Sequence, residues 1–387
     1  MKVTNLFTAF FNSEKSGGLI LIACTIISLV LANSGIGGSY VDFWKIQFAG
    51  HSIVHWINDG LMTIFFLLIG LELEREIYDG ELSKIKDALL PIFGALGGMV
   101  IPAGLYLALN FGTPTQPGAG IAMATDIAFA LGVLSLLGNR VPLSLKIFLT
   151  ALAVIDDLGA ILVIAIFYTK ALFWTNLFIA MGIFTALLVM NRLKVRNLIP
   201  YIIGGVAMWY FMLNSGIHAT ITGVLLAFAI PFGNGDEKST SYILQNFLHK
   251  PVAFLILPIF ALANTAIVMS SNIGETLTEH YSLGIALGLI VGKPLGIFLL
   301  SFLAVKLNIC KLPVDLSWRS VIGVGFLGGI GFTMSIFITL LAFDNETIIN
   351  NAKIVILIAS LIAGVIGYFF LKKVLKNNVK QDLAIIK

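Results

Sequence analysis

The chain has 387 residues, of which 58% are hydrophobic and only 11% are charged, and its formal net charge is +4. Its mean hydropathy is +0.98. About a quarter of the residues of a soluble globular domain are charged, so this composition excludes a water-soluble fold and predicts a protein whose solvent is lipid. The small net charge does not indicate nucleic-acid binding. We expect a single membrane domain over residues 1–387 that needs no cofactor.

Apolar runs follow one another along most of the chain. A helix needs about 20 apolar residues to cross a bilayer, and about twelve runs approach that length, which predicts an all-α polytopic membrane protein with about twelve transmembrane helices. The runs lie at residues 17–33, 55–79, 89–110, 119–138, 144–169, 175–191, 199–213, 217–231, 251–270, 283–305, 320–342 and 352–371.

Lysine and arginine are distributed unevenly between the loops. Most of them lie in segments on the same side as the N-terminus, whereas Lys45, Lys170 and Lys353 fall on the opposite side. Cytoplasmic loops carry the excess of positive charge in membrane proteins, so we expect both termini in the cytoplasm.

A charged cluster, which contains Glu72, Arg75 and Glu76, ends the second run. His218 begins the eighth run, in "NSGIHATITG". A histidine can respond to pH near neutrality, but a capping or packing role for His218 is an equally good interpretation.

Ionisable residues also lie in the middle of apolar runs. Thr125 and Asp126 stand in the fourth run, in "AMATDIAFALG", directly after the segment "GTPTQPGAG". Glycine and proline interrupt regular helix, so the helix around Asp126 is expected to be irregular. Asp156 and Asp157 stand in the fifth run, in "AVIDDLGAI", and Lys293 in the tenth.

Adjacent residues of a helix point about 100° apart, so Asp156 and Asp157 cannot face one cavity equally. Lys293 is the cation placed deeply enough to pair with one of them. Charges at mid-membrane cost about 2.5–3.5 kcal/mol each and are usually functional, although buried ion pairs that only hold helices together are an alternative. Three acids and one base leave a deficit of positive charge, which protons or a metal cation could fill.

The eleventh run contains "GFLGGIGFTMS", Gly325–Ser335. Four glycines in seven residues predict a break in this helix, although tight packing of small residues is an alternative. The fourth and eleventh runs occupy corresponding positions if residues 89–169 and 283–371 form two inverted repeats. Interrupted helices in matching positions of two repeats indicate a transporter binding site.

These segments resemble the signature segments of the NhaA-type sodium/proton antiporters. The resemblance rests on "FFLLIGLELERE", "ATDIAFALG", "AVIDDLGAI", "SGIHATITG", "GKPLGI" and "GGIGFTMSIF", and it runs across nearly the whole chain. It implies a twelve-helix protein of the inner membrane with discontinuous fourth and eleventh helices. It also implies electrogenic exchange of protons inward for Na⁺ or Li⁺ outward, switched on at alkaline pH.

The resemblance also implies roles for individual residues. Asp157 would be the principal carboxylate for Na⁺ and protons, and Asp156 its neighbour, paired with Lys293. Thr125 would lie near the cation, with Asp126 near the helix breaks. Glu72, Arg75 and Glu76 match a cytoplasmic cluster linked to the pH response.

Two segments depart from the family pattern. "ILQNFLHKP" has Gln245 and Asn246 where the family can carry an acid and a histidine. The pH response that the resemblance implies is therefore not expected to carry over to this segment. Residues 35–53 look shorter than the family's dimer-contacting hairpin, although a homodimer is still expected.

Two alternative functions are a solute/cation symporter and a membrane enzyme. A solute/cation symporter would need a roomier polar site, and none stands out. A membrane enzyme would need catalytic residues near one membrane face, whereas these acids lie in mid-span, so no enzymatic activity is expected.

Overall fold

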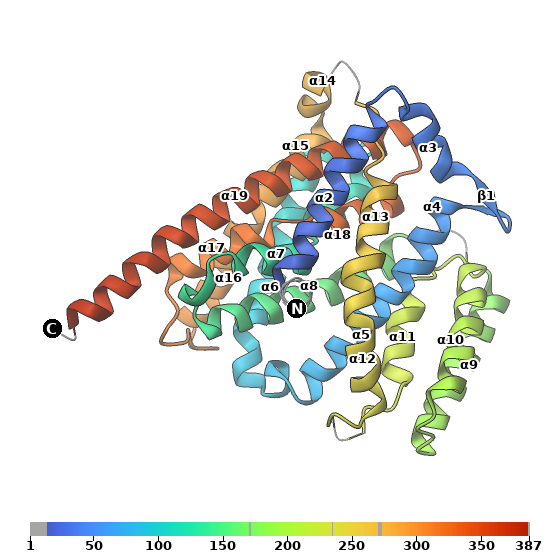
Figure 1. Cartoon of the computed structure of the whole chain (residues 1–387). Coiled ribbons are helices and arrows are strands. Elements are labelled where there is room, and N and C mark those ends of the chain that lie inside the picture. Colours follow the sequence, from blue (N-terminus) through green and yellow to red (C-terminus); the bar gives the residue numbers. More distant parts are fainter. Residues whose placement is uncertain (1–13, 170–171, 234, 270–272, 386–387) are drawn as a thin grey trace, which may run out of the picture. The chain divides into compact units, whose positions relative to one another are not determined.

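The computed structural model describes residues 14–169, 172–233, 235–269 and 273–385 (Figure 1). In this part of the chain, eight helices are long and apolar enough to cross a membrane, or up to ten if each of two bent pairs is one span. Two further predicted runs contain the shorter helices α10 (Leu198–Leu213) and α11 (Ile221–Ala229). The prediction of an all-α polytopic membrane fold is confirmed.

The chain divides into two compact units. Unit 1 comprises Met1–Ile22, Lys84–Ala160 and Met269–Lys387, and unit 2 comprises Ala23–Ser83 and Ile161–Val268. Helices α2 (Glu14–Ala32) and α8 (Leu143–Phe167) contribute residues to both units.

Unit 1 is built around the packing of two long spans. These two spans are α6 (Ile85–Asn110) and α16 (Lys293–Lys306). The unit also contains η3 (Gln116–Met123), α7 (Ile127–Ser135), η4 (Gly138–Arg140), α14 (Ile273–Thr278), α15 (His280–Leu287), η6 (Gly288–Gly292), α17 (Trp318–Gly328), α18 (Phe332–Ala342) and α19 (Glu346–Ile385). Helix α6 packs along α16, where a Cβ atom on Gly97 or on Gly296 would lie 2.0 Å from the other residue's carbonyl oxygen. Only glycine allows two backbones to approach this closely.

Unit 2 is built around α5 (Met62–Tyr78) and α11, which pack through glycines of both helices. A Cβ atom on Gly223 of α11 would lie 2.2 Å from the carbonyl oxygen of Thr63 on α5. The other elements of unit 2 are α3 (Gly37–Lys45), β1 (Gln47–Phe48), β2 (His51–Ser52), α4 (Ile53–His55), η1 (Trp56–Leu61), η2 (Glu81–Ser83), α9 (Trp174–Arg192), α10, α12 (Thr240–Pro251), η5 (Val252–Ile256) and α13 (Leu257–Asn264).

The fourth and eleventh spans are both discontinuous, as predicted. In the fourth span the 3₁₀-helix η3 ends at Met123, and α7 begins at Ile127 after a non-helical segment. In the eleventh span α17 and α18 are separated by three residues and bent by 49° relative to each other. The sequence cause in the fourth span is Pro117 with its neighbouring glycines, which disfavour an α-helical ladder.

The glycines of the eleventh span act through close packing as well as at the break. None of them has a positive φ angle. A Cβ atom on Gly325 would lie 2.6 Å from Cα of Pro294, and one on Gly329 would lie 2.2 Å from the carbonyl oxygen of Leu289. The two interpretations of this motif, a helix break and small-residue packing, therefore both hold.

The tenth span contains a wider turn directly before Lys293. Residues 288–292 form the π-helix η6 between α15 and α16, and Pro294 follows Lys293. Proline lacks an N–H group and clashes with the carbonyl group four residues earlier, which accounts for the irregular turn. The irregularity places Lys293 at the start of a new helical segment.

The connection between the first two spans contains a hairpin. Strands β1 and β2 pair antiparallel, with Gln47 opposite Ser52 and Phe48 opposite His51. Ala49 and Gly50 between the strands both have positive φ angles, of 48° and 86°. Two such residues form the turn that matches the twist of a tight hairpin. The short segment thus still forms a hairpin, although its role in dimerisation stays a prediction.

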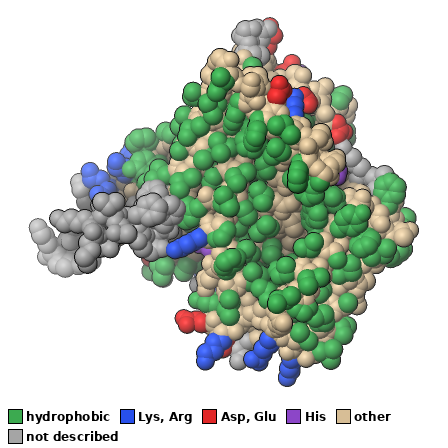
Figure 2. All heavy atoms as spheres, turned by 45° about the vertical axis from the view of Figure 1, so that its right-hand side comes forward, with side chains coloured by type: hydrophobic (Ala, Val, Ile, Leu, Met, Phe, Trp, Pro, Cys, Tyr) green, Lys and Arg blue, Asp and Glu red, His purple; other side chains and the backbone are tan. Residues whose placement is uncertain are grey.

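The surface is rich in apolar side chains. Figure 2 shows a face on which hydrophobic side chains are spread widely and charged side chains are few, and residues such as Phe178 and Phe369 are more than half exposed. Lys353 lies near the start of α19 and is buried, and its placement on the outer side of the membrane stays a prediction. The exposed apolar surface is what a lipid solvent requires. Lys170 and both ends of the chain lie outside the described residues.

Candidate functional site

A buried ion pair lies inside unit 1. The Lys293 ammonium group is 2.5 Å from Oδ2 of Asp156, and neither side chain is exposed to solvent. Lys293 comes from the first residue of α16 and Asp156 from the middle of α8. Oδ1 of Asp156 is buried and has no hydrogen-bond partner among the described residues. One oxygen of this carboxylate is therefore able to accept a further ligand.

Asp157 is the next residue along α8 and is also buried. Its side chain points about 100° away from that of Asp156 because the two are adjacent in a helix. The Asp157 carboxylate nevertheless lies close enough to Lys293 to attract the ammonium group electrostatically. If both aspartates are ionised and Lys293 is protonated, these three groups carry a net charge of −1.

Thr125 connects the ion pair with the broken helices. Its hydroxyl accepts a hydrogen bond of 2.8 Å from the Lys293 ammonium group. The same hydroxyl donates one of 2.8 Å to the carbonyl oxygen of Gly328. Gly328 is the last residue of α17, so this bond satisfies one of the carbonyl groups that a helix C-terminus leaves without a partner.

Asp126 holds the N-termini of two half-helices. One carboxylate oxygen accepts a hydrogen bond of 2.9 Å from the Phe129 N–H group of α7, and the other accepts one of 3.2 Å from the Thr333 N–H group of α18. The Thr333 hydroxyl donates to the same carboxylate. The Asp126 N–H group donates to the carbonyl oxygen of Ile330, at a distance of 2.7 Å.

This arrangement stabilises a negative charge at Asp126. Helix N-termini carry partial positive charge, and a carboxylate placed there interacts favourably with it. Asp126 is only 2% exposed, so the two N-termini take the place of water around it. The carboxylate thereby connects the starts of α7 and α18.

The structure brings together Thr125, Asp126, Asp156, Asp157 and Lys293 within unit 1. The described residues contain no group of three or more His, Cys, Asp or Glu side chains arranged to hold a metal ion. Besides the carboxylates, the Thr125 hydroxyl and the Gly328 carbonyl group bring oxygen atoms to this cluster. Carbonyl groups at interrupted helices coordinate Na⁺ in transporters with broken helices.

The predicted pH-response residues lie in unit 2, at the C-terminal end of α5. Oε1 of Glu72 is 3.8 Å from Nδ1 of His249, and the Arg75 guanidinium group lies 4.7 Å from the ring centre of Tyr242. Glu76 is partly buried and Glu74 is almost fully buried. The sequence predicts no role for Glu74, yet its Oε2 is buried and has no hydrogen-bond partner within the described part of the chain.

His218 also lies in unit 2, before α11. Its Nε2 atom is 3.1 Å from the carbonyl oxygen of Tyr168. This contact ties the start of the eighth span to the end of α8, which is a packing role.

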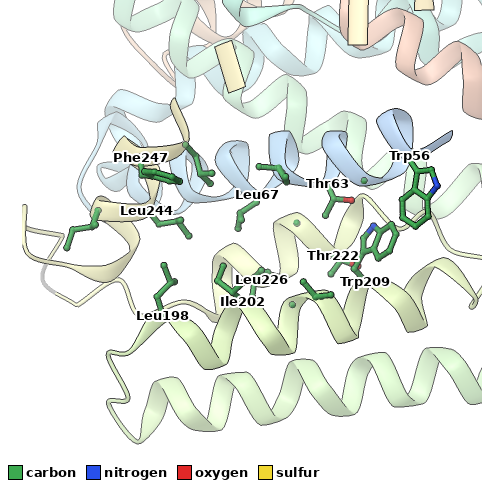
Figure 3. Close-up of a pocket in the computed structure, with 17 residues that line it drawn as sticks. Trp56, Thr63, Leu67, Leu198, Ile202, Trp209, Thr222, Leu226, Leu244 and Phe247 are labelled. Carbon is green, nitrogen blue, oxygen red and sulfur yellow. The ribbon is translucent and has the colours of Figure 1, made fainter. Parts of the chain in front are cut away.

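A cavity of about 700 Å³ lies inside unit 2, between α5, α10, α11 and α12 (Figure 3). Trp56 and Trp209 lie at one end, with their rings 6.0 Å apart, and Leu244 and Phe247 lie at the other. The lining contains no charged side chain. The lining offers the hydroxyl groups of Thr63 and Thr222 but no carboxylate, so the buried aspartates of unit 1 are the better candidate for an ion site.

Two hydroxyl residues at the break of the eleventh span had no predicted role. Thr333 bonds Asp126, and the Ser360 hydroxyl of α19 accepts a hydrogen bond of 3.1 Å from the Phe332 N–H group. Thr333 stands inside the glycine-rich motif, which was a usable signal. Ser360 is a single hydroxyl in a long apolar run, and the sequence offers no signal for it.

The chain is similar to known proteins over nearly its whole length. A family model described as Na⁺/H⁺ antiporter 1 matches residues 8–371. The chain is 77% identical to the Na⁺/H⁺ antiporter NhaA of Flavobacterium psychrophilum over 382 residues, covering 99% of this chain and all of the relative. It is 59% identical to the NhaA of Dechloromonas aromatica, covering 97% of this chain and 98% of the relative. It is 46% identical to NhaA 1 of Clostridium beijerinckii, covering 98% of each. The chain therefore belongs to the Na⁺/H⁺ antiporter 1 family.

Proposed function

We propose that this protein exchanges Na⁺ for protons across the bacterial inner membrane and that both ions compete for Asp156 and Asp157. The observation that carries this proposal is the buried group of two aspartates and one lysine beside two broken helices. The names of the relatives support the choice of ions. Binding one Na⁺ neutralises the net charge of −1, and so does binding one proton.

Asp157 is the proposed principal ligand, and Asp156 the second. Lys293 and Na⁺ would then compete for Asp156, because both cations seek its carboxylate oxygens. If the site exchanges two protons for one Na⁺, its two loaded states differ by one elementary charge. The exchange is then electrogenic, and the membrane potential drives protons inward and Na⁺ outward. Li⁺ has the same charge and is proposed as a second substrate.

Regulation by pH is proposed to involve the cluster of Glu72, Arg75 and Glu76. The contact between Glu72 and His249 supports this idea, because protonation of the histidine changes its charge next to a carboxylate. His218 is a weaker candidate because its ring contacts a backbone carbonyl group. Gln245 and Asn246 do not titrate, so they cannot contribute.

The proposed topology places both termini in the cytoplasm, in agreement with the distribution of lysine and arginine. A homodimer is proposed as well. The hairpin of β1 and β2 supports it, because its residues are largely exposed.

The experiment is Na⁺-driven proton movement in proteoliposomes, measured for the wild type and for Asp157→Asn. The substitution keeps the shape of the side chain and removes its charge, so exchange should fall to background. Asp42→Asn, at an exposed position of α3, is the matched control and should exchange at the wild-type rate. Undiminished exchange by Asp157→Asn would show that the site is assigned wrongly.

A further inference from the structure

Ser360 lies in the middle of α19, in the apolar segment "VILIASLIAGVIG". Its side chain is buried, with 5% of the residue exposed. The hydroxyl oxygen accepts the hydrogen bond from the N–H group of Phe332. A buried hydroxyl in such a helix would otherwise satisfy itself on the helix's own backbone.

Phe332 is the first residue of α18, where the eleventh span resumes after its break. The first N–H groups of a helix have no partner within the helix. The Phe332 N–H group is paired with Ser360, and the next, from Thr333, is paired with Asp126. The N–H group of Ser335 is the first of these that bonds within the segment, to the carbonyl oxygen of Gly331.

Two neighbouring N–H groups are thus held by side chains from two different spans. Peptide groups are planar, so the directions of consecutive N–H groups in a helical turn are fixed relative to each other. An acceptor that fixes the first N–H group also fixes where the second one points. Ser360 therefore sets the orientation in which Thr333 meets the Asp126 carboxylate.

The effect reaches the ion pair in two further steps. Asp126 is bonded to the break through its own N–H group, which donates to Ile330. Its neighbour Thr125 carries the hydroxyl that accepts from Lys293. A shift at the start of α18 would therefore move the hydroxyl that positions the lysine next to Asp156.

We propose that Ser360 is a positioning residue of the ion site, acting through the N-terminus of α18 and Asp126. This inference rests on the proposed function, because it assigns a role in Na⁺ binding to a residue that contacts no ion. The twelfth span thereby takes part in the site through one hydroxyl.

The test compares Ser360→Ala with Ser301→Ala. Ser301 lies on α16, is fully buried, and its hydroxyl has no hydrogen-bond partner among the described residues. Both variants remove a buried hydroxyl, but only Ser360→Ala leaves a buried N–H group without an acceptor. The readouts are the Na⁺ concentration for half-maximal exchange in proteoliposomes, its dependence on pH, and the apparent melting temperature in detergent.

We expect Ser360→Ala to raise the half-maximal Na⁺ concentration about fivefold, the lower end of the effect of an unsatisfied buried donor, and to shift the pH profile. Ser301→Ala should change neither, even if both variants melt at a lower temperature. An unchanged half-maximal concentration and pH profile in Ser360→Ala would overturn the positioning role, because a purely structural residue affects only stability and the amount of protein.

Two conservative variants keep the test decisive if Ser360→Ala does not accumulate. Ser360→Thr keeps the hydroxyl and should bind Na⁺ like the wild type, whereas Ser360→Cys offers only a weak acceptor and should bind less tightly. Equal half-maximal concentrations in these two variants would refute the inference. Absence of exchange in the wild type would refute the proposed function itself, which separates the two failures.

Discussion

Replacing Lys293 by methionine tests the buried ion pair directly. Methionine keeps an unbranched chain of similar length but removes the ammonium group from Asp156. The pair is fully buried with a contact of 2.5 Å, and removing one partner of such a pair costs about 3–5 kcal/mol. The loss arises because a carboxylate remains in a dry site with no counter-charge.

The loss should depend on pH in a defined direction. The folded variant can lower its cost by taking up a proton at Asp156, which the unfolded chain releases at neutral pH. Stability then falls as pH rises, by about 1.4 kcal/mol per pH unit. In the wild type the Lys293 ammonium group favours the ionised form of Asp156, so the stability of the wild type should depend on pH less steeply. Lys293→Met should therefore be destabilised much more near pH 8.5 than near pH 6.

The assay is the apparent melting temperature of the purified protein in detergent at both pH values. A second substitution, Asp156→Asn, removes the charge that has lost its partner, so the double variant Lys293→Met/Asp156→Asn should be more stable than Lys293→Met, and its stability should depend on pH less steeply. The reasoning fails if the double variant is as unstable as Lys293→Met, or if Lys293→Met loses equal stability at both pH values.

Three further predictions concern the broken helices. Thr125→Val removes one hydrogen-bond acceptor and one donor at nearly constant shape. It should lower the free energy of unfolding by about 1–3 kcal/mol, seen as a lower melting temperature, and weaken Na⁺ binding, seen as a higher half-maximal Na⁺ concentration. Gly329→Ala should lower the free energy of unfolding by about 1–3 kcal/mol in melting experiments, because its Cβ atom would lie 2.2 Å from a carbonyl oxygen. Gly104→Ala is the control and should not destabilise the protein, because its Cβ atom would meet nothing within 4 Å. Asp126→Ala should lower the yield of folded protein in the membrane, because the N-termini of α7 and α18 lose their shared acceptor. Asp126→Asn keeps one acceptor oxygen and should give an intermediate yield.

The sequence was sufficient for the spans and for the charged members of the site. Apolar runs must be long in a membrane protein, so their positions follow from hydropathy. Asp156, Asp157 and Lys293 could be found because charges are rare and costly in such runs. The breaks at Ala124–Asp126 and after Gly328 were predictable from proline and glycine.

Other features depend on contacts that no local pattern encodes. The role of Ser360 depends on where α19 crosses the start of α18, and isolated serines are common in apolar helices. The burial of Glu74 depends on which face of α5 is covered by other helices. The sequence alone does not distinguish Glu74 from the neighbouring glutamates Glu72 and Glu76. The hairpin depends on Ala49 adopting a positive φ angle, which alanine rarely does. The close contacts of Gly325 and Gly329 likewise involve residues of a different span.

The Asp126 carboxylate has a mechanical consequence for transport. It is bonded to α7 through Phe129 and to α18 through Thr333, so neither half-helix can slide past the other without breaking a bond to a buried charge. We expect α7 and α18 to move together as one rigid body during a transport cycle. Any bending at the two breaks would then change the orientation of η3 and α17, which lie on the other side of each break.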